Sequence, residues 1–264
     1  MKSELYDAIR YYLASSYYSM KNWVNSPYQV WFFVLQNLIS LSFLILSISV
    51  IYSVSSGITG WSYFQLLFLS VLSQLTMGIS SFVVIPQMLP EMLREGQFDT
   101  YLVRPYGKLT LMASSMGIVS YFFSYFIGGI AVLAYISVRL KLQPAALLGL
   151  LPLYVLGVAA FTMFMAVLAV AMYAFFKSGA ATQQIERVLW TLGAYPLNVY
   201  GAAAQLFFTL LVPIGIATYY PSQAFFGRVS LLHYAFLSIF AVFFISLMYM
   251  LFNRLMRSYE SGGG

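Results

Sequence analysis

The longest stretch without a charged side chain sets the fold class of this chain. From Asn22 to Pro90, 69 consecutive residues contain no Asp, Glu, Lys or Arg, and a second such run covers the 30 residues from Leu109 to Val138. A helix needs about 20 predominantly apolar residues to cross a bilayer. Only 8% of the 264 residues are charged, against about 25% in a soluble domain. We therefore predict an all-α, multi-pass membrane protein without a sizeable soluble domain.

The uncharged runs predict six membrane-spanning helices. The run from Val188 to Gly227 is too long for one straight span and could just hold two. With one span there, ten of the 13 Lys and Arg residues lie on the side of the membrane that holds both termini, and three lie on the other side. With two spans there, the division is nine against four. Because Lys and Arg are in excess on the cytoplasmic side of membrane proteins, the more uneven division is favoured. We therefore expect one fifth span kinked at Pro196, then a re-entrant outer segment, 212–227, that begins near Pro213. The expected spans are about 30–54, 62–86, 110–137, 145–176, 188–211 and 230–252.

The first 27 residues predict an amphipathic helix that precedes the spans. Glu4, Asp7, Arg10 and Lys21 lie on one face, and apolar residues recur on the other. Such a helix lies on the membrane surface or packs against protein, and it can do both if one face contacts the membrane and the other contacts protein. No apolar core with a small-residue cleavage site opens the chain, so we expect no signal peptide; residues 258–264 are expected to be a flexible tail. The apolar face consists of Leu5, Ile9, Leu13, Tyr17, Met20 and Val24.

A charged loop, residues 87–108, separates the second and third predicted spans. Six of the 20 charged side chains lie between Glu91 and Lys108, so this loop must lie in water. Pro90 suits the first turn of a short helix and Gly96 its C-terminal cap. Apolar side chains among the charges fit a protein-docking element with anchors and orienting charges; the alternative is a solvated connector. The candidate docking residues are Glu91, Met92, Leu93, Arg94, Glu95, Phe98, Asp99 and Arg104.

Uncharged polar side chains mark a candidate pathway through the spans. Ionisable residues are nearly absent from the spans, which disfavours an ion-coupled carrier. Polar strips also hold helices together by hydrogen bonds, so helix packing is the alternative role of these residues. The candidate pathway residues are Gln36, Ser40, Ser73, Gln74, Met77, Asn198 and Gln205.

Two stretches resemble one family of transporters. The segment EGQFDTYLVRPYGKL is similar to the cytoplasmic loop of permease subunits in the type-2 family of ATP-binding-cassette exporters. Residues 194–227, with Tyr195-Pro196, Pro213 and Tyr219-Tyr220-Pro221, are similar to the fifth span and outer segment of one bacterial branch of that family.

The resemblance implies a particular assembly. It implies a permease of the prokaryotic cytoplasmic membrane with both termini in the cytoplasm, an identical or related second permease, and two separate ATPase subunits. It further implies that residues 90–103 form a coupling helix that docks on the ATPase, that residues 3–24 form an elbow helix beside it, and that a path lies between the first, second and fifth spans.

The chain lacks the residues that catalysis or metal binding would need. No GxxxxGK[ST] motif occurs, so ATP and Mg²⁺ are expected on the partner ATPase. His233 is the only histidine and there is no cysteine, so we expect neither a metal site nor a catalytic site. The basic residues are spread over several loops, which disfavours nucleic acid as a partner. We predict a permease that exports a hydrophobic or amphipathic substrate; the alternative is a membrane scaffold or immunity-type protein that does not transport.

Overall fold

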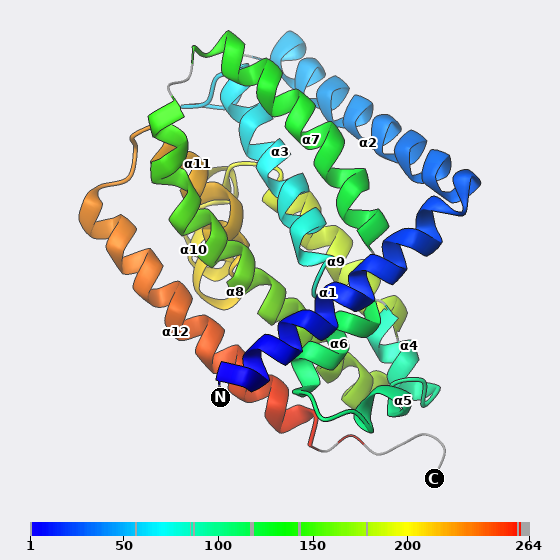
Figure 1. Cartoon of the computed structure of the whole chain (residues 1–264). Coiled ribbons are helices and arrows are strands. Elements are labelled where there is room, and N and C mark those ends of the chain that lie inside the picture. The colour runs from blue at the N-terminus through cyan, green and yellow to red at the C-terminus, as the bar shows by residue number, and fades with distance from the viewer. Residues whose placement is uncertain are drawn as a thin grey trace.

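The protein is a bundle of helices, and a computed structural model describes residues 2–55, 57–84, 86, 88–116, 119–141, 144–177, 179–257 and 259. Within these residues every regular element is helical. Long helices run side by side through the bundle in Figure 1, with α8 packed against α12 and α3 against α7. They are α2 (Pro27–Val54), α3 (Tyr63–Ser80), α7 (Val119–Arg139), α8 (Pro144–Phe176) and α12 (Leu231–Leu255).

Local sequence signals explain where several of these helices begin. Pro27 occupies the first turn of α2, where its missing N–H costs no hydrogen bond. At α3, the Ser62 Oγ accepts from the Gln65 N–H (3.4 Å) and the Gln65 Oε1 accepts from the Ser62 N–H (3.1 Å), which forms a capping box. At α12, the Ser230 Oγ accepts from the His233 N–H at 3.3 Å. Each cap satisfies backbone donors that the first helical turn leaves free.

The helices match the predicted spans only in part. Among the described helices, four are long and apolar enough to cross a membrane, and one bent pair would make a fifth. The predicted spans 30–54, 145–176 and 230–252 correspond to α2, α8 and α12, whereas the second ends early because α3 stops at Ser80. The third is divided between α6 (Lys108–Met116) and α7, with residues 117 and 118 outside the described part. The predicted tail also lies outside it, except for Tyr259.

The fifth predicted span, 188–211, folds differently from the expectation. Six short elements follow α8: α9 (Gly179–Gly193), the 3₁₀ helix η1 (Leu197–Tyr200), α10 (Ala202–Leu206), the π-helices η2 (Phe207–Leu211) and η3 (Gly215–Tyr219), and α11 (Tyr220–Phe225). α9 ends before Pro196, and η1 leads to Gly201 at φ +85°. The chain then bends by 91° at a break that contains Pro213, which has no N–H to continue the helix. The expected re-entrant segment, 212–227, is therefore only the second arm of a bent pair whose first arm is 202–211.

The second arm of the bent pair is packed deep in the bundle. All five residues of η3 are buried, and η3 contacts α8 and α3. At Gly157 of α8, an added Cβ would lie 2.5 Å from the Ile216 carbonyl carbon and 2.7 Å from Ala217 Cα. Glycine is therefore required for this close approach of the two backbones.

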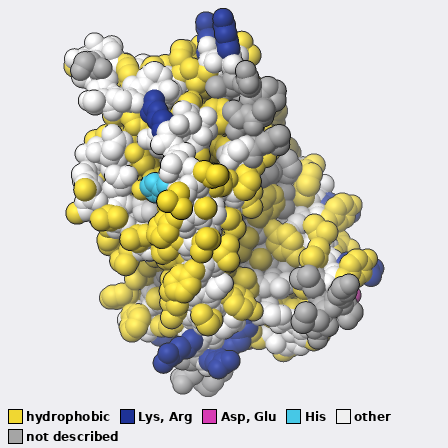
Figure 2. All heavy atoms as spheres, turned by 90° about the vertical axis from the view of Figure 1, so that its left-hand side faces the viewer, with side chains coloured by type: hydrophobic (Ala, Val, Ile, Leu, Met, Phe, Trp, Pro, Cys, Tyr) yellow, Lys and Arg dark blue, Asp and Glu magenta, His cyan; other side chains and the backbone are white. Residues whose placement is uncertain are grey.

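The surface along α12 is apolar between basic ends. Figure 2 shows a continuous hydrophobic area on this face, with Lys and Arg side chains gathered at both of its ends. On α12, Leu232, Ile239 and Phe243 are 83%, 71% and 60% exposed. Large exposed apolar area of this kind is unfavourable in water and favourable against lipid hydrocarbon.

Candidate functional site

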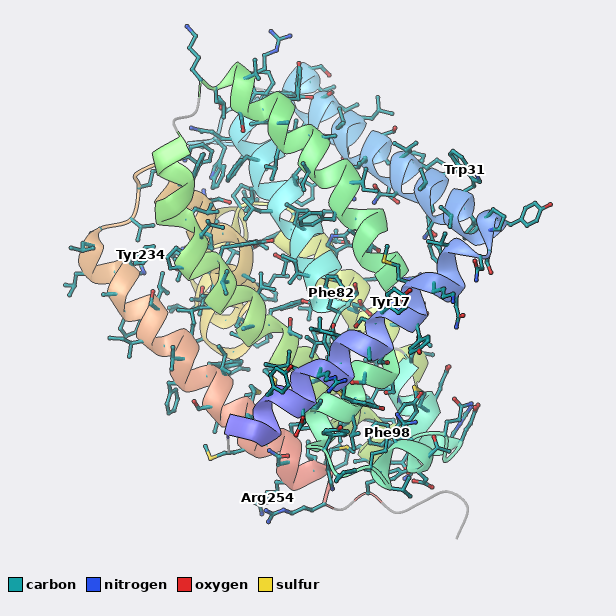
Figure 3. The ribbon with its side chains drawn as sticks, in the orientation of Figure 1. Tyr17, Trp31, Phe82, Phe98, Tyr234 and Arg254 are labelled. Atoms are coloured by element: carbon teal, nitrogen blue, oxygen red, sulfur yellow. The ribbon has the colours of Figure 1, made fainter. Side chains whose placement is uncertain are left out.

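The charged loop lies at one end of the bundle and is anchored by its own apolar side chains. It holds α4 (Met88–Arg94) and α5 (Asp99–Leu102), which Gly96 separates at φ +67°. Leu89, Leu93 and Phe98 are fully buried in a cluster with residues of α6, α8 and α9; Figure 3 shows Phe98 beneath the bundle. Leu93 and Phe98 were expected to be exposed anchors for a partner. They instead fix the loop to its own bundle, because burial there removes their apolar surface from water.

The charged side chains of the loop remain available at the surface. Glu91, Arg94, Glu95 and Arg104 are exposed, whereas Met92 is half-buried against the loop's own cluster. The Arg94 Nη2 and Glu95 Oε1 lie 3.5 Å apart, which is a weak exposed ion pair worth about 0–1 kcal/mol. Of the expected orienting charges, Glu91, Arg94 and Glu95 are therefore exposed, with little ion-pair energy between them, whereas Asp99 is half-buried beside Tyr259.

Both ends of the chain are tied to the charged loop. The Tyr259 hydroxyl lies 2.9 Å from the Asp99 carboxylate and 3.2 Å from the Leu93 carbonyl oxygen, and can donate to either. Burial, followed by the bond to Asp99, raises the pKa of the Tyr259 hydroxyl, so it stays a donor. From the other end of the chain, Tyr11 accepts a hydrogen bond from Arg104, whose guanidinium also lies over the Tyr11 ring.

The N-terminal helix α1 (Lys2–Val24) uses two faces. Ile9, Leu13 and Tyr17 of the predicted apolar face are exposed, so this face points away from the protein. A neighbouring side binds the bundle: the Tyr12 hydroxyl donates to the Phe82 carbonyl at 2.8 Å. In Figure 3, Tyr17 and Phe82 lie on α1 and on the segment just after α3. The arrangement suits a helix that rests on a membrane surface and is fixed to protein from one side.

A cavity of about 340 Å³ lies between α2, α3 and α9. Two of the predicted pathway residues, Ser40 and Gln74, line it. Gln74 is only 2% exposed, and its Oε1 has no hydrogen-bond partner among the residues that the structure describes. An unpaired buried acceptor costs about 1–3 kcal/mol, so this amide is a candidate contact for a bound molecule. The remaining lining is Phe43, Leu44, Ser47, Ser70, Trp190, Thr191, Ala194 and Tyr195.

Two other predicted pathway residues bond to other parts of the chain, and a third is buried outside the cavity. The Trp61 Nε1–H donates to the Asn198 Oδ1 at 3.3 Å, and the Gln205 Nε2 lies 3.3 Å from the Tyr220 hydroxyl oxygen. Ser73 is 1% exposed and does not line the cavity. These positions match the packing alternative.

The last two predicted pathway residues also lie outside the cavity. Gln36 is exposed on α2, and Met77 is partly buried against the apolar cluster that holds the charged loop. Of the seven predicted positions, the structure therefore brings only Ser40 and Gln74 together.

The comparison with protein families decides the class. A model described as ABC-2 family transporter protein matches residues 38–263, which include the charged loop, the cavity and the bent pair. The chain belongs to the ABC-2 transporter family. No curated protein and no solved structure matched it.

Membership of the ABC-2 family makes the chain a multi-pass membrane protein of the ABC transporter permease type. The family associates with ABC ATPases. Among the described residues, no group of His, Cys, Asp and Glu could hold a metal ion.

The aromatic wall of this ABC-2 cavity was not predicted from the sequence. Trp190 and Tyr195 stand at the end of α9, where the chain leaves the helix before Pro196. The helix-ending proline together with adjacent aromatic residues was the available signal. This signal did not lead to a predicted aromatic wall, because we expected the span to continue through Pro196 with only a kink.

Proposed function

We propose that this chain is the permease subunit of an ATP-driven exporter in the cytoplasmic membrane of a prokaryote, with both termini in the cytoplasm. The observation that carries the proposal is the charged loop, which is rigidly anchored and presents Glu91, Arg94, Glu95 and Arg104 outward. Two ATPase subunits would dock there and would bind the ATP and Mg²⁺ for which this chain has no P-loop. Rim charges of this kind set orientation and partner choice in protein interfaces.

Packing offers a route from the loop to the cavity. Leu93 and Phe98 share one apolar cluster with Leu189 of α9. One residue further along α9, Trp190 lines the cavity. Because packed interiors transmit displacement instead of absorbing it, movement of the docked loop would shift α9 and change the cavity wall. This is how ATP hydrolysis on the partner would act on the transported molecule.

The cavity supports a hydrophobic or amphipathic substrate. Its volume of about 340 Å³ lies at the lower end of the range of about 300–1,000 Å³ for small-molecule sites. Its walls combine aromatic and aliphatic side chains with a few hydroxyl groups and the amide of Gln74. Only 17% of the apolar membrane-spanning segment of α2 is buried, so the helix that forms one wall of the cavity is largely uncovered by the rest of the protein. A second permease, identical or related, would complete that wall and enclose the path.

Copurification with the ATPase tests the proposal. The double variant Arg94→Glu, Glu95→Lys should lose the ATPase and ATP-dependent export while keeping the thermal stability of the wild type, since both side chains are exposed. Arg139→Glu, at an exposed charge at the end of α7, is the matched control and should change neither ATPase binding nor export. Absence of any copurifying ATPase, or full ATPase binding by the double variant, would overturn the proposal. If the chain is a non-transporting scaffold, it would bind its partner, but neither the wild type nor the double variant would show transport.

A further inference from the structure

Two open cavities meet on the side of the bundle where α1 crosses α6. One, of about 310 Å³, lies between α1, α6 and the segment after α3; the other, of about 340 Å³, lies between α3, α6 and α8. Val83 and Leu109 line both, so the two cavities adjoin, and together we call them the side trough. Its rim includes Ile9 and Val155, which are 50% and 61% exposed.

The side trough is separate from the cavity between α2, α3 and α9. On α3 the side trough is lined by Ile79 and that cavity by Ser70. These residues are nine positions apart, which at 100° per residue places them on opposite faces of the helix. A molecule in the side trough would therefore lie outside the proposed transport path.

Most hydroxyl groups of the side trough already donate hydrogen bonds within the protein. Tyr12 donates to the Phe82 carbonyl, and the Tyr154 hydroxyl donates to the Leu72 carbonyl at 3.3 Å. The Thr162 Oγ1 donates to the Val158 carbonyl at 2.7 Å. Three of the four lining hydroxyl groups are thus engaged inside the protein. A water molecule needs two to four polar partners, so an apolar occupant is favoured.

The dimensions and position of the side trough match one leaflet of a bilayer. From Tyr154 to Met163, the α8 wall rises by about 14 Å at about 1.5 Å per residue. Half of a hydrocarbon core about 30 Å thick is about 15 Å. At the other end of the trough lies α1, whose exposed apolar residues Ile9 and Leu13 suit the headgroup boundary. The fourth hydroxyl, of Thr110, lies in the first turn of α6 at this same end.

We propose that the side trough binds one acyl chain of a bilayer phospholipid, with the headgroup at the α1 end. The chain would fill the space between α3 and α8 and would pack under α1. Burial of the acyl chain couples the position of α1 to the presence of lipid, because α1 and α6 contribute Ala8 and Ala113 to the wall of the side trough.

Photolabelling of the full-length protein tests this binding. The protein is reconstituted in vesicles of phosphatidylethanolamine and phosphatidylglycerol that contain a phospholipid with a diazirine midway along one acyl chain. After illumination, mass spectrometry locates the label. We expect labelling at residues 79–83 and 154–163 to exceed that of the α12 face around Ile239, which is exposed to bulk lipid.

A tryptophan in the trough supplies the matched variant. Ala159→Trp fills the trough and should lower its labelling about tenfold, equivalent to about 1.4 kcal/mol. Ala235→Trp, on the exposed face of α12, should leave it unchanged. If Ala159→Trp does not fold, Ala8→Phe blocks the other cavity from α1 with the same expectation. Equal labelling of the trough and the α12 face, labelling that the filling variants do not reduce, or a protein cross-link in place of lipid would overturn the proposal.

Discussion

Adding one methyl group at Gly157 should separate the second arm of the bent pair from α8. The new Cβ of Gly157→Ala would lie 2.7 Å from Ala217 Cα, whereas carbon atoms pack best at about 3.5–4.0 Å. The two backbones must therefore part by about 1 Å. Gly149→Ala on the same helix is the matched control, because no described atom lies within 4 Å of its added Cβ.

The two substitutions should change stability in opposite directions. Overpacking costs about 1–3 kcal/mol, and replacing a helical glycine by alanine returns about 0.5–1 kcal/mol. Gly157→Ala should thus lower the free energy of unfolding by about 1–2 kcal/mol, whereas Gly149→Ala should raise it by about 0.5–1 kcal/mol. At about 2–4 °C per kcal/mol, the melting temperature should fall by about 2–8 °C in the first and rise by about 1–4 °C in the second.

Thermal unfolding in one detergent measures this difference. The wild type and both variants are heated in parallel, and the fraction that still elutes as folded protein in gel filtration gives each midpoint. A midpoint for Gly157→Ala at or above that of the wild type would refute the close packing of η3 on α8. A fall in both variants would show that glycine is needed along α8 for some other reason.

Three further substitutions test other contacts. Tyr259→Phe should increase trypsin cleavage within the charged loop about fivefold, since it removes about 1 kcal/mol of hydrogen bonding, while Tyr249→Phe on the exposed side of α12 should not. Ser62→Ala should lower stability by about 1 kcal/mol in the same thermal assay because it breaks a capping box; Ser246→Ala, whose hydroxyl bonds only within an exposed turn of α12, should have little effect. Gln74→Leu should raise stability by about 1 kcal/mol by removing an unpaired buried acceptor, and a fall of that size would contradict its lack of a partner.

The uncharged runs of the sequence predict the helices better than they predict the path of the chain. An apolar run long enough to cross a membrane can also fold back, and the two outcomes have the same hydropathy. Pro196 and Pro213 signal interruption, but a proline does not state whether the helix kinks or ends. The placement of η3 depends on the space beside α8 and α3, which no local pattern encodes.

The charged loop shows a second limit of sequence reasoning. Apolar side chains among charges suit either a partner's groove or the protein's own core, and their spacing is the same in both cases. The choice at Leu93 and Phe98 depends on a pocket built by α6, α8 and α9. By contrast, Ser40 and Gln74 line the cavity between α2, α3 and α9, and their role in a transport path stays a prediction.

The bonds to Tyr259 bear on the order of events during synthesis. This residue contacts Asp99 across 160 positions, and the neighbouring Met256 carbonyl accepts from Lys108 across 148. The charged loop cannot make these contacts until α12 has left the ribosome and entered the bilayer. A nascent or truncated chain would therefore present a loosely held loop, and an ATPase that docks there, as proposed, would be recruited only once α12 is in place.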